Sequence, residues 1–372
     1  MTETPHPNPL PPDFAALRRG AMGEGEWSPD LQDSPSPAMR ERAGVRDSVP
    51  VLSVRDLSVT FDTDTRPITA VDRVSFDLHA GEVLGVVGES GCGKSVTASS
   101  ILRLLPSPPG RIAGGSVHFE GRDLLRAPIP ELRALRGKRI SMIFQDPMSA
   151  LSPLHRIGAQ LVEAIQLHES VSDREAWRRG EDWLGRVGIP DPAQRMQAWP
   201  HELSGGMRQR VMIAMALMLK PSIVIADEPT TALDVTIQAQ IFDLMRELKD
   251  ADTAIILITH DMGVIWEMCD RALVMYAGQV VEQGPVADLF RAPRHPYTAG
   301  LLRSMPRGPQ AGRRLATIPG QVPSPRDYPS GCRFADRCPH RMSRCTAEAP
   351  TRFAVEPGRD AACFLVPEGR TP

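Results

Sequence analysis

The most informative segment of this 372-residue chain is Leu203-Ser204-Gly205-Gly206-Met207. An earlier glycine-rich loop reads Gly88-Glu89-Ser90-Gly91-Cys92-Gly93-Lys94-Ser95, a spacing typical of loops that bind phosphate through converging backbone N–H groups. The later segment places a serine hydroxyl and glycine N–H groups at the start of a predicted helix, which makes a second anion site. Because the two sites lie too far apart in the sequence to serve one pocket, they predict a head-to-tail dimer with each nucleotide between two subunits.

The bulk composition limits the class of protein. A hydrophobic content of 41% and a net charge of −2 are ordinary for a soluble globular protein and suggest no polyanionic partner overall. The longest apolar stretch, Val211–Ala226, is interrupted by Lys220-Pro221 and is shorter than the ~20 residues of a membrane-spanning helix. No secretion signal is evident. The sequence therefore predicts a cytoplasmic protein of about two domains that reaches a membrane only through partners.

The predicted fold is α/β, with a phosphate-loop (P-loop) NTPase core. Residues 1–48 are rich in proline and lack a periodic apolar pattern, which indicates a disordered extension. The apolar run Val83–Val87 predicts a parallel strand buried on both faces. Residues from about 155 to 205 carry apolar side chains at helical spacing, which predicts an inserted helical subdomain. The other predicted elements are β-edge strands at 51–54 and 71–78, helices at 94–105 and 235–249, and strands at 140–144, 222–226 and 254–259.

Polar residues at the ends of the apolar strands predict a site for ATP and Mg²⁺. Lys94 supplies a cation for the β- and γ-phosphates, and the Ser95 hydroxyl is a candidate Mg²⁺ ligand. Asp227 ends an apolar strand and can hold Mg²⁺ through water, while Glu228 can orient or deprotonate the attacking water. Gln145 follows another strand, and its amide can reach both the metal and the water. The predicted phosphate-binding residues of the loop are Gly88, Ser90, Gly91 and Gly93.

The order of these motifs over residues 51–285 resembles the ATP-binding cassette of ABC transporters. The resemblance implies that Ser204, Gly205 and Gly206 contact ATP that is held by a partner subunit. It also implies that His260, which follows an apolar strand, contacts the γ-phosphate as a catalytic residue.

The same resemblance assigns roles at three further positions. Gln145 matches the loop that senses the membrane subunits, and Asp234 matches the loop that lies across the dimer seam. Phe61 stands 27 residues before Gly88, about where cassettes place an aromatic ring that stacks on adenine. A phenylalanine of the hydrophobic core is an equally good interpretation of Phe61.

Two C-terminal segments narrow the resemblance: Arg294–Leu302, which reads RHPYTAGLL, and Pro329–Pro339, which reads PSGCRFADRCP. Together with Met207, they resemble the oligopeptide/dipeptide (peptide/nickel) importer branch. This branch implies an ATPase subunit at the cytoplasmic face of the cell membrane that powers uptake of di- or oligopeptides. The implied partners are a second, different ATPase subunit, two transmembrane permease subunits and an extracytoplasmic substrate-binding protein.

Two alternatives remain open for the function. Related importers carry nickel or another small solute, and nothing in this type of subunit contacts the cargo. Residues 285–372 hold 14 arginines and no lysine, so an ATPase that handles nucleic acid through this end is a second and less favoured hypothesis. The favoured interpretation has no nucleic-acid partner.

Four of the six cysteines crowd into the C-terminal region, which in a cytoplasmic protein favours a metal or cluster site over disulfides. Cys332, Cys338, Cys345 and Cys363 lack the close C-x-x-C pairs of most structural zinc sites. Their spacing suits a larger cubane, and the resemblance also implies a [4Fe–4S] cluster; zinc and four unliganded thiols are the alternatives. The arginines expected to offset the charge of such a cluster are Arg333, Arg337, Arg341 and Arg344.

The predicted division is a disordered extension at 1–48, a nucleotide-binding domain at 49–285, and a Cys- and Pro-rich domain at 286–372. The last domain is expected to be too small for a sufficient core of its own and to depend on the cluster. Loss of Cys338 is therefore expected to unfold it and to leave nucleotide binding largely intact.

Overall fold

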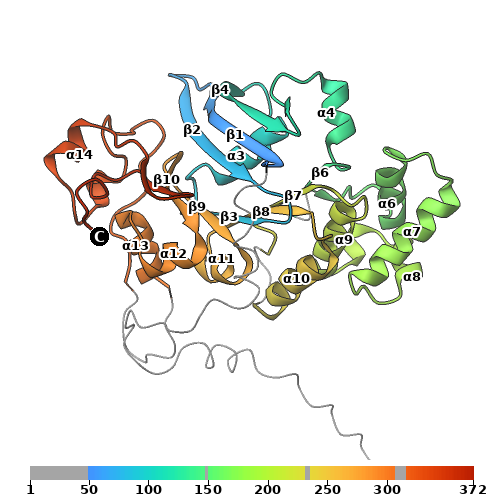
Figure 1. Cartoon of the computed structure of the whole chain (residues 1–372). Coiled ribbons are helices and arrows are strands. Elements are labelled where there is room, and N and C mark those ends of the chain that lie inside the picture. The colour runs from blue at the N-terminus through green and yellow to red at the C-terminus, as the bar shows by residue number, and fades with distance from the viewer. Residues whose placement is uncertain (1–48, 147–149, 231–234, 306–315) are drawn as a thin grey trace, which may run out of the picture.

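The computed structural model describes residues 49–146, 150–230, 235–305 and 316–372 (Figure 1). Within these residues the chain forms two sheets. The larger has eight strands in the order β11-β12-β10-β9-β3-β8-β7-β6, and the smaller has four in the order β2-β1-β4-β5. The predicted 1–48 extension and Asp234 lie outside the described residues.

The centre of the larger sheet is parallel. It consists of β3 (Val83–Val87), β6 (Ile140–Ile143), β7 (Ile223–Asp227), β8 (Ala254–Thr259) and β9 (Arg271–Tyr276). β3 pairs in parallel with both β8 and β9, and β7 pairs in parallel with β8 and β6. Residues of β3, β7 and β8 are buried throughout, as their continuous apolar sequences predict. Because these strands run the same way, the loops that follow them meet at one edge of the sheet.

The smaller sheet is antiparallel and confirms the predicted β edge. It contains β1 (Leu52–Phe61), β2 (Ile68–Leu78), β4 (Gly110–Phe119) and the short β5 (Arg122–Asp123). Apolar side chains on its inner face pack against the larger sheet in one hydrophobic core. In Figure 1, β1, β2 and β4 lie above the central strands of the larger sheet.

Helix α3 (Lys94–Ile101) follows the phosphate loop and packs between the two sheets. It ends at Ile101, so the predicted end at Leu105 is wrong. Leu102 already has non-helical dihedral angles, and Arg103 has φ +50°, a left-handed conformation that cannot continue a right-handed helix.

The predicted helical subdomain is present at one end of the molecule (Figure 1). It contains α6 (Ile157–Gln166), α7 (Asp173–Arg186), α8 (Pro192–Met196) and the 3₁₀ turn η2 (Pro200–Glu202). Its apolar faces join the main hydrophobic core. The remaining helices are α4 (Ile129–Leu135), α9 (Gly205–Leu217), α10 (Val235–Leu248), α11 (Met262–Met268), α12 (Val286–Arg291), α13 (Pro296–Arg303), the 3₁₀ turn η3 (Ala335–Arg337) and α14 (Ser343–Ala347).

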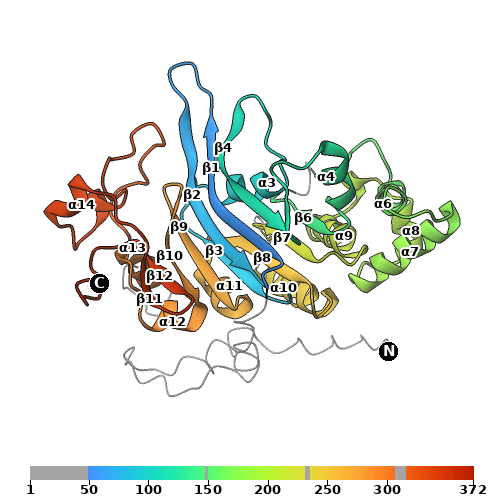
Figure 2. The ribbon, with the colours of Figure 1, turned by 45° about the horizontal axis from the view of Figure 1, so that its top comes forward.

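The C-terminal region continues the larger sheet. β12 (Arg359–Ala361) pairs antiparallel with β10 (Gln279–Pro285), and β11 (Phe353–Glu356) pairs with β12. Figure 2 shows these strands beside β10, at the edge opposite β6. The region's own core is small, with Ala335, Cys345 and Phe364 at its centre.

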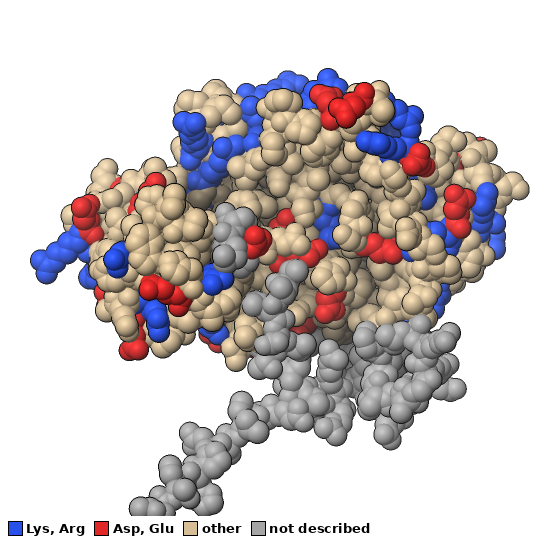
Figure 3. All heavy atoms as spheres, turned by 180° about the vertical axis from the view of Figure 1, so that it is seen from behind, with Lys and Arg blue, Asp and Glu red and all other residues tan. Residues whose placement is uncertain are grey.

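On the face seen in Figure 3, basic groups gather along the upper edge and acidic groups lie near the middle. In the part of the chain that the structure describes, every helix is too short or too polar to span a bilayer.

Candidate nucleotide site and cysteine pocket

The phosphate loop lies between β3 and α3, as predicted, and its glycines are required by close backbone approaches. A Cβ atom on Gly88 would lie 2.2 Å from the carbonyl oxygen of Met275. Gly93 has φ +99°, and a Cβ there would lie 2.7 Å from the carbonyl oxygen of Ala70. Any side chain at either position would therefore push the loop off the neighbouring strands.

Lys94 is held inside this loop. Its side chain is 5% exposed, and its Nζ donates to the carbonyl oxygens of Gly88 at 2.8 Å and Glu89 at 3.3 Å. Nζ is also 3.9 Å from Oε1 of Glu228. The ammonium group is thus oriented by the loop that it is predicted to serve, close to the position where phosphate oxygens would bind.

The two predicted Mg²⁺ ligands on α3 and β7 are in contact. Ser95 Oγ donates a hydrogen bond of 2.9 Å to Oδ1 of Asp227. Burial raises the pKa of Asp227, and the neighbouring Glu228 carboxylate raises it further, while Ser95 and Lys94 act in the opposite direction. A divalent cation would favour the ionised form of this carboxyl group, so the hydroxyl and carboxylate fit a magnesium site.

Glu228 is the point on which the predicted catalytic residues converge. Nε2 of Gln145 donates to Oε2 of Glu228 at 3.3 Å, and Nδ1 of His260 lies 3.4 Å from the same oxygen. The side chain of His260 is 64% exposed, whereas that of Glu228 is 15% exposed. Glu228 also has φ +44°, a strained conformation for a residue with a Cβ atom. The loops after β6, β7 and β8 therefore bring Gln145, Glu228 and His260 together.

The signature segment caps a different helix. Ser204 is the N-cap of α9, and its Oγ accepts a hydrogen bond of 3.3 Å from the N–H of Met207. Ser204 and Gly205 are exposed. Among the described residues, no hydrogen bond or ion pair joins Ser204 to the phosphate loop. Its predicted contact with the nucleotide of another subunit stays a prediction.

Phe61 lies at the end of β1 and is half-buried. Its ring packs beside Gly110, where a Cβ atom would lie 3.2 Å from Cε1 of the ring, and it contacts the core between the sheets. This position is compatible with the core interpretation, and stacking on adenine stays a prediction.

The four C-terminal cysteines line one pocket. Phe334, Phe364 and other apolar side chains complete its wall, and His340 also faces it. Burial raises the pKa of Cys332 to about 11 and that of Cys363 to about 12, so both are protonated at neutral pH unless a metal binds. Among the described residues, no group of three or more His, Cys, Asp or Glu side chains is arranged to hold a metal ion.

The arginines interleaved with these cysteines have other partners. Each of the four forms an ion pair with a carboxylate, so the expectation that they offset the charge of a cluster finds no support. The pairs are Arg333–Asp72 at 2.5 Å, Arg337–Glu89 at 2.7 Å, Arg341–Asp336 at 3.0 Å and Arg344–Glu348 at 3.0 Å.

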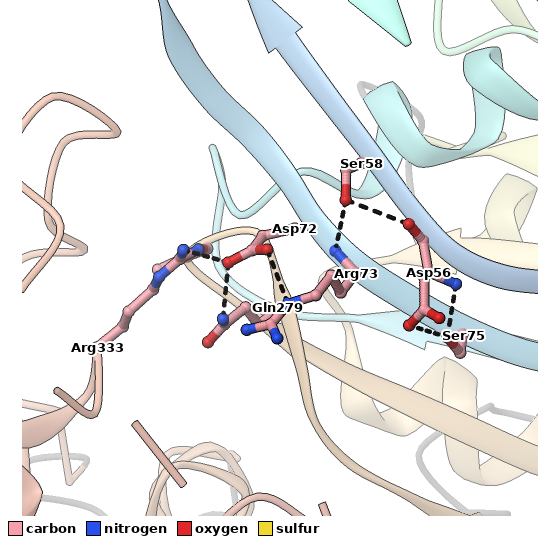
Figure 4. A network of polar contacts seen from close by, with 8 residues as sticks. Asp56, Ser58, Asp72, Arg73, Ser75, Gln279 and Arg333 are labelled. Atoms are coloured by element: carbon pink, nitrogen blue, oxygen red, sulfur yellow. Dashed lines mark hydrogen bonds and ion pairs between the residues drawn. The ribbon is translucent and has the colours of Figure 1, made fainter. Parts of the chain in front are cut away.

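Two of these pairs connect the C-terminal region to the nucleotide-binding core, which sequence reasoning missed. Arg333 reaches Asp72 on β2 (Figure 4), and Arg337 reaches Glu89 in the phosphate loop. The only sequence signal was a glutamate inside the loop, at a position where the phosphate-loop pattern accepts any residue.

Family models match two parts of the chain. The model described as "ABC transporter" matches residues 71–231, and "Oligopeptide/dipeptide transporter, C-terminal region" matches residues 281–345. A third model, described as "AAA domain, putative AbiEii toxin, Type IV TA system", matches residues 198–265, which overlap the first.

Full-length relatives settle the family. A probable peptide ABC transporter ATP-binding protein of Sinorhizobium fredii is 52% identical over 318 residues, which cover 84% of this chain and 94% of that protein. The chain belongs to the ATP-binding proteins of ABC transporters. The oligopeptide transport ATP-binding protein OppD of Salmonella typhimurium is also 52% identical, over 84% of this chain and 93% of its own length. The dipeptide transport ATP-binding protein DppD of Escherichia coli is 49% identical over 84% and 96%.

Solved structures confirm the ABC ATPase fold. A dimeric ATP-binding cassette in a post-hydrolysis state, bound to ADP and Pi, is similar with a TM-score of 0.57 and 26% identity. The match covers 63% of this chain and 98% of that structure. A cbiO1 subunit from Clostridium perfringens, part of a cbiONQ transporter complex, gives a TM-score of 0.53 at 27% identity over 65% of this chain and 91% of its own.

Proposed function

We propose that this ABC ATPase powers the import of di- or oligopeptides across the cytoplasmic membrane, from its cytoplasmic face. The observation that carries the ATPase assignment is the convergence of Gln145, His260 and Lys94 on the carboxylate of Glu228. The peptide substrate is supported by the names of the relatives, which are oligopeptide and dipeptide transport proteins. Those names favour peptides over nickel or another small solute.

Each residue has a definite task in this proposal. The phosphate-loop N–H groups and Lys94 bind the β- and γ-phosphates, and Ser95 and Asp227 are the residues that would hold Mg²⁺. That ion, when bound, neutralises charge on the phosphate oxygens. Glu228 accepts a proton from the attacking water as it approaches the γ-phosphate.

Two exposed groups then complete the reaction centre. Gln145 and His260 contact the same oxygen of Glu228, so they orient this carboxylate and are placed to contact the water and the γ-phosphate. Gln145 also follows β6, the edge strand of the larger sheet on the side of the helical subdomain (Figure 1), and this placement supports its role in sensing the membrane subunits.

The site also needs a second subunit. Ser204 caps α9 and Gly206 lies in its first turn, and both are exposed or partly exposed, which supports a contact of this helix N-terminus with ATP bound by another ATPase chain. We place Asp234 and Phe61 in the same proposal, at the dimer seam and at the adenine. The proposed partners are a different ATPase subunit, two transmembrane permease subunits and, through them, an extracytoplasmic substrate-binding protein.

The basic C-terminal region gives little support to a role with nucleic acid. Several of its described arginines pair with carboxylates of the same chain, including Arg352 with Asp360 at 2.7 Å and the buried pair Arg359–Glu282 at 3.3 Å. Arginines already paired in this way contribute less to the binding of a polyanion.

We further propose that Cys332, Cys338, Cys345 and Cys363 hold a [4Fe–4S] cluster that stabilises residues 286–372 as a small domain attached to the 49–285 nucleotide-binding domain. The gathering of all four thiols around one apolar pocket supports this proposal, because iron–sulfur clusters are held by cysteine thiolates. Protein purified without oxygen should contain about four irons and four labile sulfides per chain. Stoichiometric zinc without sulfide would overturn this assignment.

The transport proposal is tested with the assembled complex in lipid vesicles. Phosphate release should rise when binding protein loaded with a peptide is added to the extracytoplasmic side, and a Lys94→Ala subunit should abolish the response. A response to nickel-loaded binding protein and none to peptide-loaded binding protein would show that the cargo is nickel and not a peptide. The absence of nucleotide hydrolysis under every condition would overturn the ATPase assignment.

A further inference from the structure

Glu89, the second residue of the phosphate loop, is held by the C-terminal region. Its carboxylate forms two parallel hydrogen bonds with Arg337, from Nη1 to Oε2 at 2.7 Å and from Nη2 to Oε1 at 2.9 Å. The side chain of Arg337 is only 5% exposed and that of Glu89 is 31% exposed. A bidentate pair with one buried partner is stronger and better oriented than an ordinary surface ion pair.

The backbone of Glu89 is fixed from the same side. Its N–H donates a hydrogen bond of 2.8 Å to Oη of Tyr297, a residue of α13 that is fully buried. The ring of Tyr297 packs against those of Tyr276 and Phe334, with centroids 4.7 and 5.4 Å apart. Because the ring is locked in this cluster, its hydroxyl is a fixed acceptor for the loop.

Arg337 is itself rigidly placed. Its Nε donates to the carbonyl oxygen of Pro319 at 2.8 Å, and its guanidinium also donates to the carbonyl oxygen of Ile318 and to the hydroxyl of Tyr276, both at 3.3 Å. The guanidinium therefore joins three parts of the chain at the phosphate loop.

A second link ties the same region to the core. Arg333 reaches Asp72 on β2 (Figure 4) and also donates to the carbonyl oxygen of Ala277. Gln279 donates to the same carboxylate oxygen of Asp72 at 2.9 Å. The C-terminal region is thus fixed to the core at a second point, in addition to its contact with Glu89.

We propose that Arg337 and Tyr297 are positioning residues, through which the C-terminal region sets the charge and shape of the phosphate loop. Without Arg337, the Glu89 carboxylate would leave an unbalanced negative charge in a loop that must bind a polyphosphate. Without the Tyr297 hydroxyl, the N–H of Glu89 loses its partner, and the loop occupies its binding conformation for a smaller fraction of the time. This inference rests on the proposed binding of ATP by the loop.

The contact changes one expectation drawn from the sequence. Arg337 directly precedes Cys338, so unfolding the region around the cysteine pocket removes the partner of Glu89. Cys338→Ser should therefore weaken nucleotide binding as well as unfold the C-terminal region, instead of leaving binding intact.

The test compares full-length variants for binding of the nonhydrolysable analogue AMP-PNP with Mg²⁺, by calorimetry. If the binding-competent loop falls to between about a third and a tenth of the population, Tyr297→Phe should weaken binding about threefold to tenfold. Arg337→Met should weaken it at least as much. In the assembled complex, the KM for ATP should rise more than kcat falls, because Glu228 is untouched. The control is Arg291→Met, which removes an exposed arginine that pairs with Asp288 on α12.

A double-mutant cycle separates positioning from general destabilisation. If Arg337 acts through Glu89, Arg337→Met should cause no further loss of AMP-PNP affinity in a Glu89→Ala background. An equal loss in both backgrounds, or wild-type affinity in both Tyr297→Phe and Arg337→Met, would overturn the inference. Lys94→Ala gives the reference: if wild type binds AMP-PNP and Lys94→Ala does not, the proposed ATP site stands whatever the other variants show. If wild type does not bind, both proposals fall.

Discussion

Replacing Glu228 with glutamine tests the assignment of the catalytic base. The side chain is 15% exposed and lies among Nε2 of Gln145 at 3.3 Å, Nδ1 of His260 at 3.4 Å and Nζ of Lys94 at 3.9 Å. Glutamine has nearly the same shape, and its amide oxygen can still accept a hydrogen bond from Gln145. What it cannot do is take a proton from water.

The expected loss is that of a general base. Such groups contribute about 10²–10⁴ in rate, which corresponds to about 3–5 kcal/mol of activation free energy. Nucleotide binding should persist, because the substitution removes a negative charge from beside the γ-phosphate. It should also lower the pKa of Asp227, which Glu228 helps to raise, so the proposed magnesium ligand remains ionised. The ATP-bound, closed dimer should accumulate.

The assay is steady-state phosphate release by the assembled complex, with AMP-PNP affinity measured in parallel. Glu175→Gln is the control, since Glu175 is an exposed carboxylate on α7 that pairs with Arg178, and it should leave both quantities unchanged. Turnover by Glu228→Gln within about threefold of wild type would refute the role of this carboxylate. A parallel loss of AMP-PNP binding would show that Glu228 acts mainly in the ground state.

Three other predictions follow from the geometry. Lys94→Ala should reduce nucleotide affinity at least about tenfold, because it removes the cation that is held inside the phosphate loop. An unchanged affinity, measured by calorimetry, would contradict this role. Ser204→Arg should leave this chain's AMP-PNP affinity intact and impair hydrolysis in the two-subunit complex, and equal hydrolysis in wild type and variant would exclude a shared site. Burial lowers the pKa of His295 from its usual value of 6.5 to about 3. The buried neutral imidazole should therefore contribute fully to the free energy of unfolding above about pH 6.5, and below that pH the free energy of unfolding should fall by up to about 1.4 kcal/mol per pH unit. Urea unfolding at pH 7.5 and 5.5 should show a smaller difference for His295→Asn than for wild type.

The central sheet could be predicted because its signals are local. The runs at 83–87 and 254–259 are apolar throughout, as burial on both faces requires, and the structure gives strands with those same bounds. Parallel strands bring their carboxyl ends to one edge of a sheet, and the predicted site residues Gln145, Glu228 and His260 follow β6, β7 and β8. The contacts of Glu228 with Gln145 and His260 are those expected from that rule.

The end of the chain was less predictable because its strands are short and paired over long separations. β12 has three residues, too few for an alternating pattern, and it joins β10 through Glu282 and Gln283. The sequence suggested a separate domain at this point, and composition alone could not show that this region adds strands to the core sheet. The domain boundary at 285 remains a proposal.

The same separation hid the contact that ties the C-terminal region to the phosphate loop. Arg337 and Glu89 are 248 positions apart. The sequence alone assigns Arg337 to the cysteines beside it and Glu89 to the phosphate loop, so neither residue indicates the other as its partner. Only the fold shows that Arg337 pairs with the loop while Cys338, the next residue, turns toward the pocket. A short turn at Ala335–Arg337 therefore joins the two sites. Because one turn serves both, we expect a change in the structure of the cysteine pocket to alter the geometry of the phosphate loop.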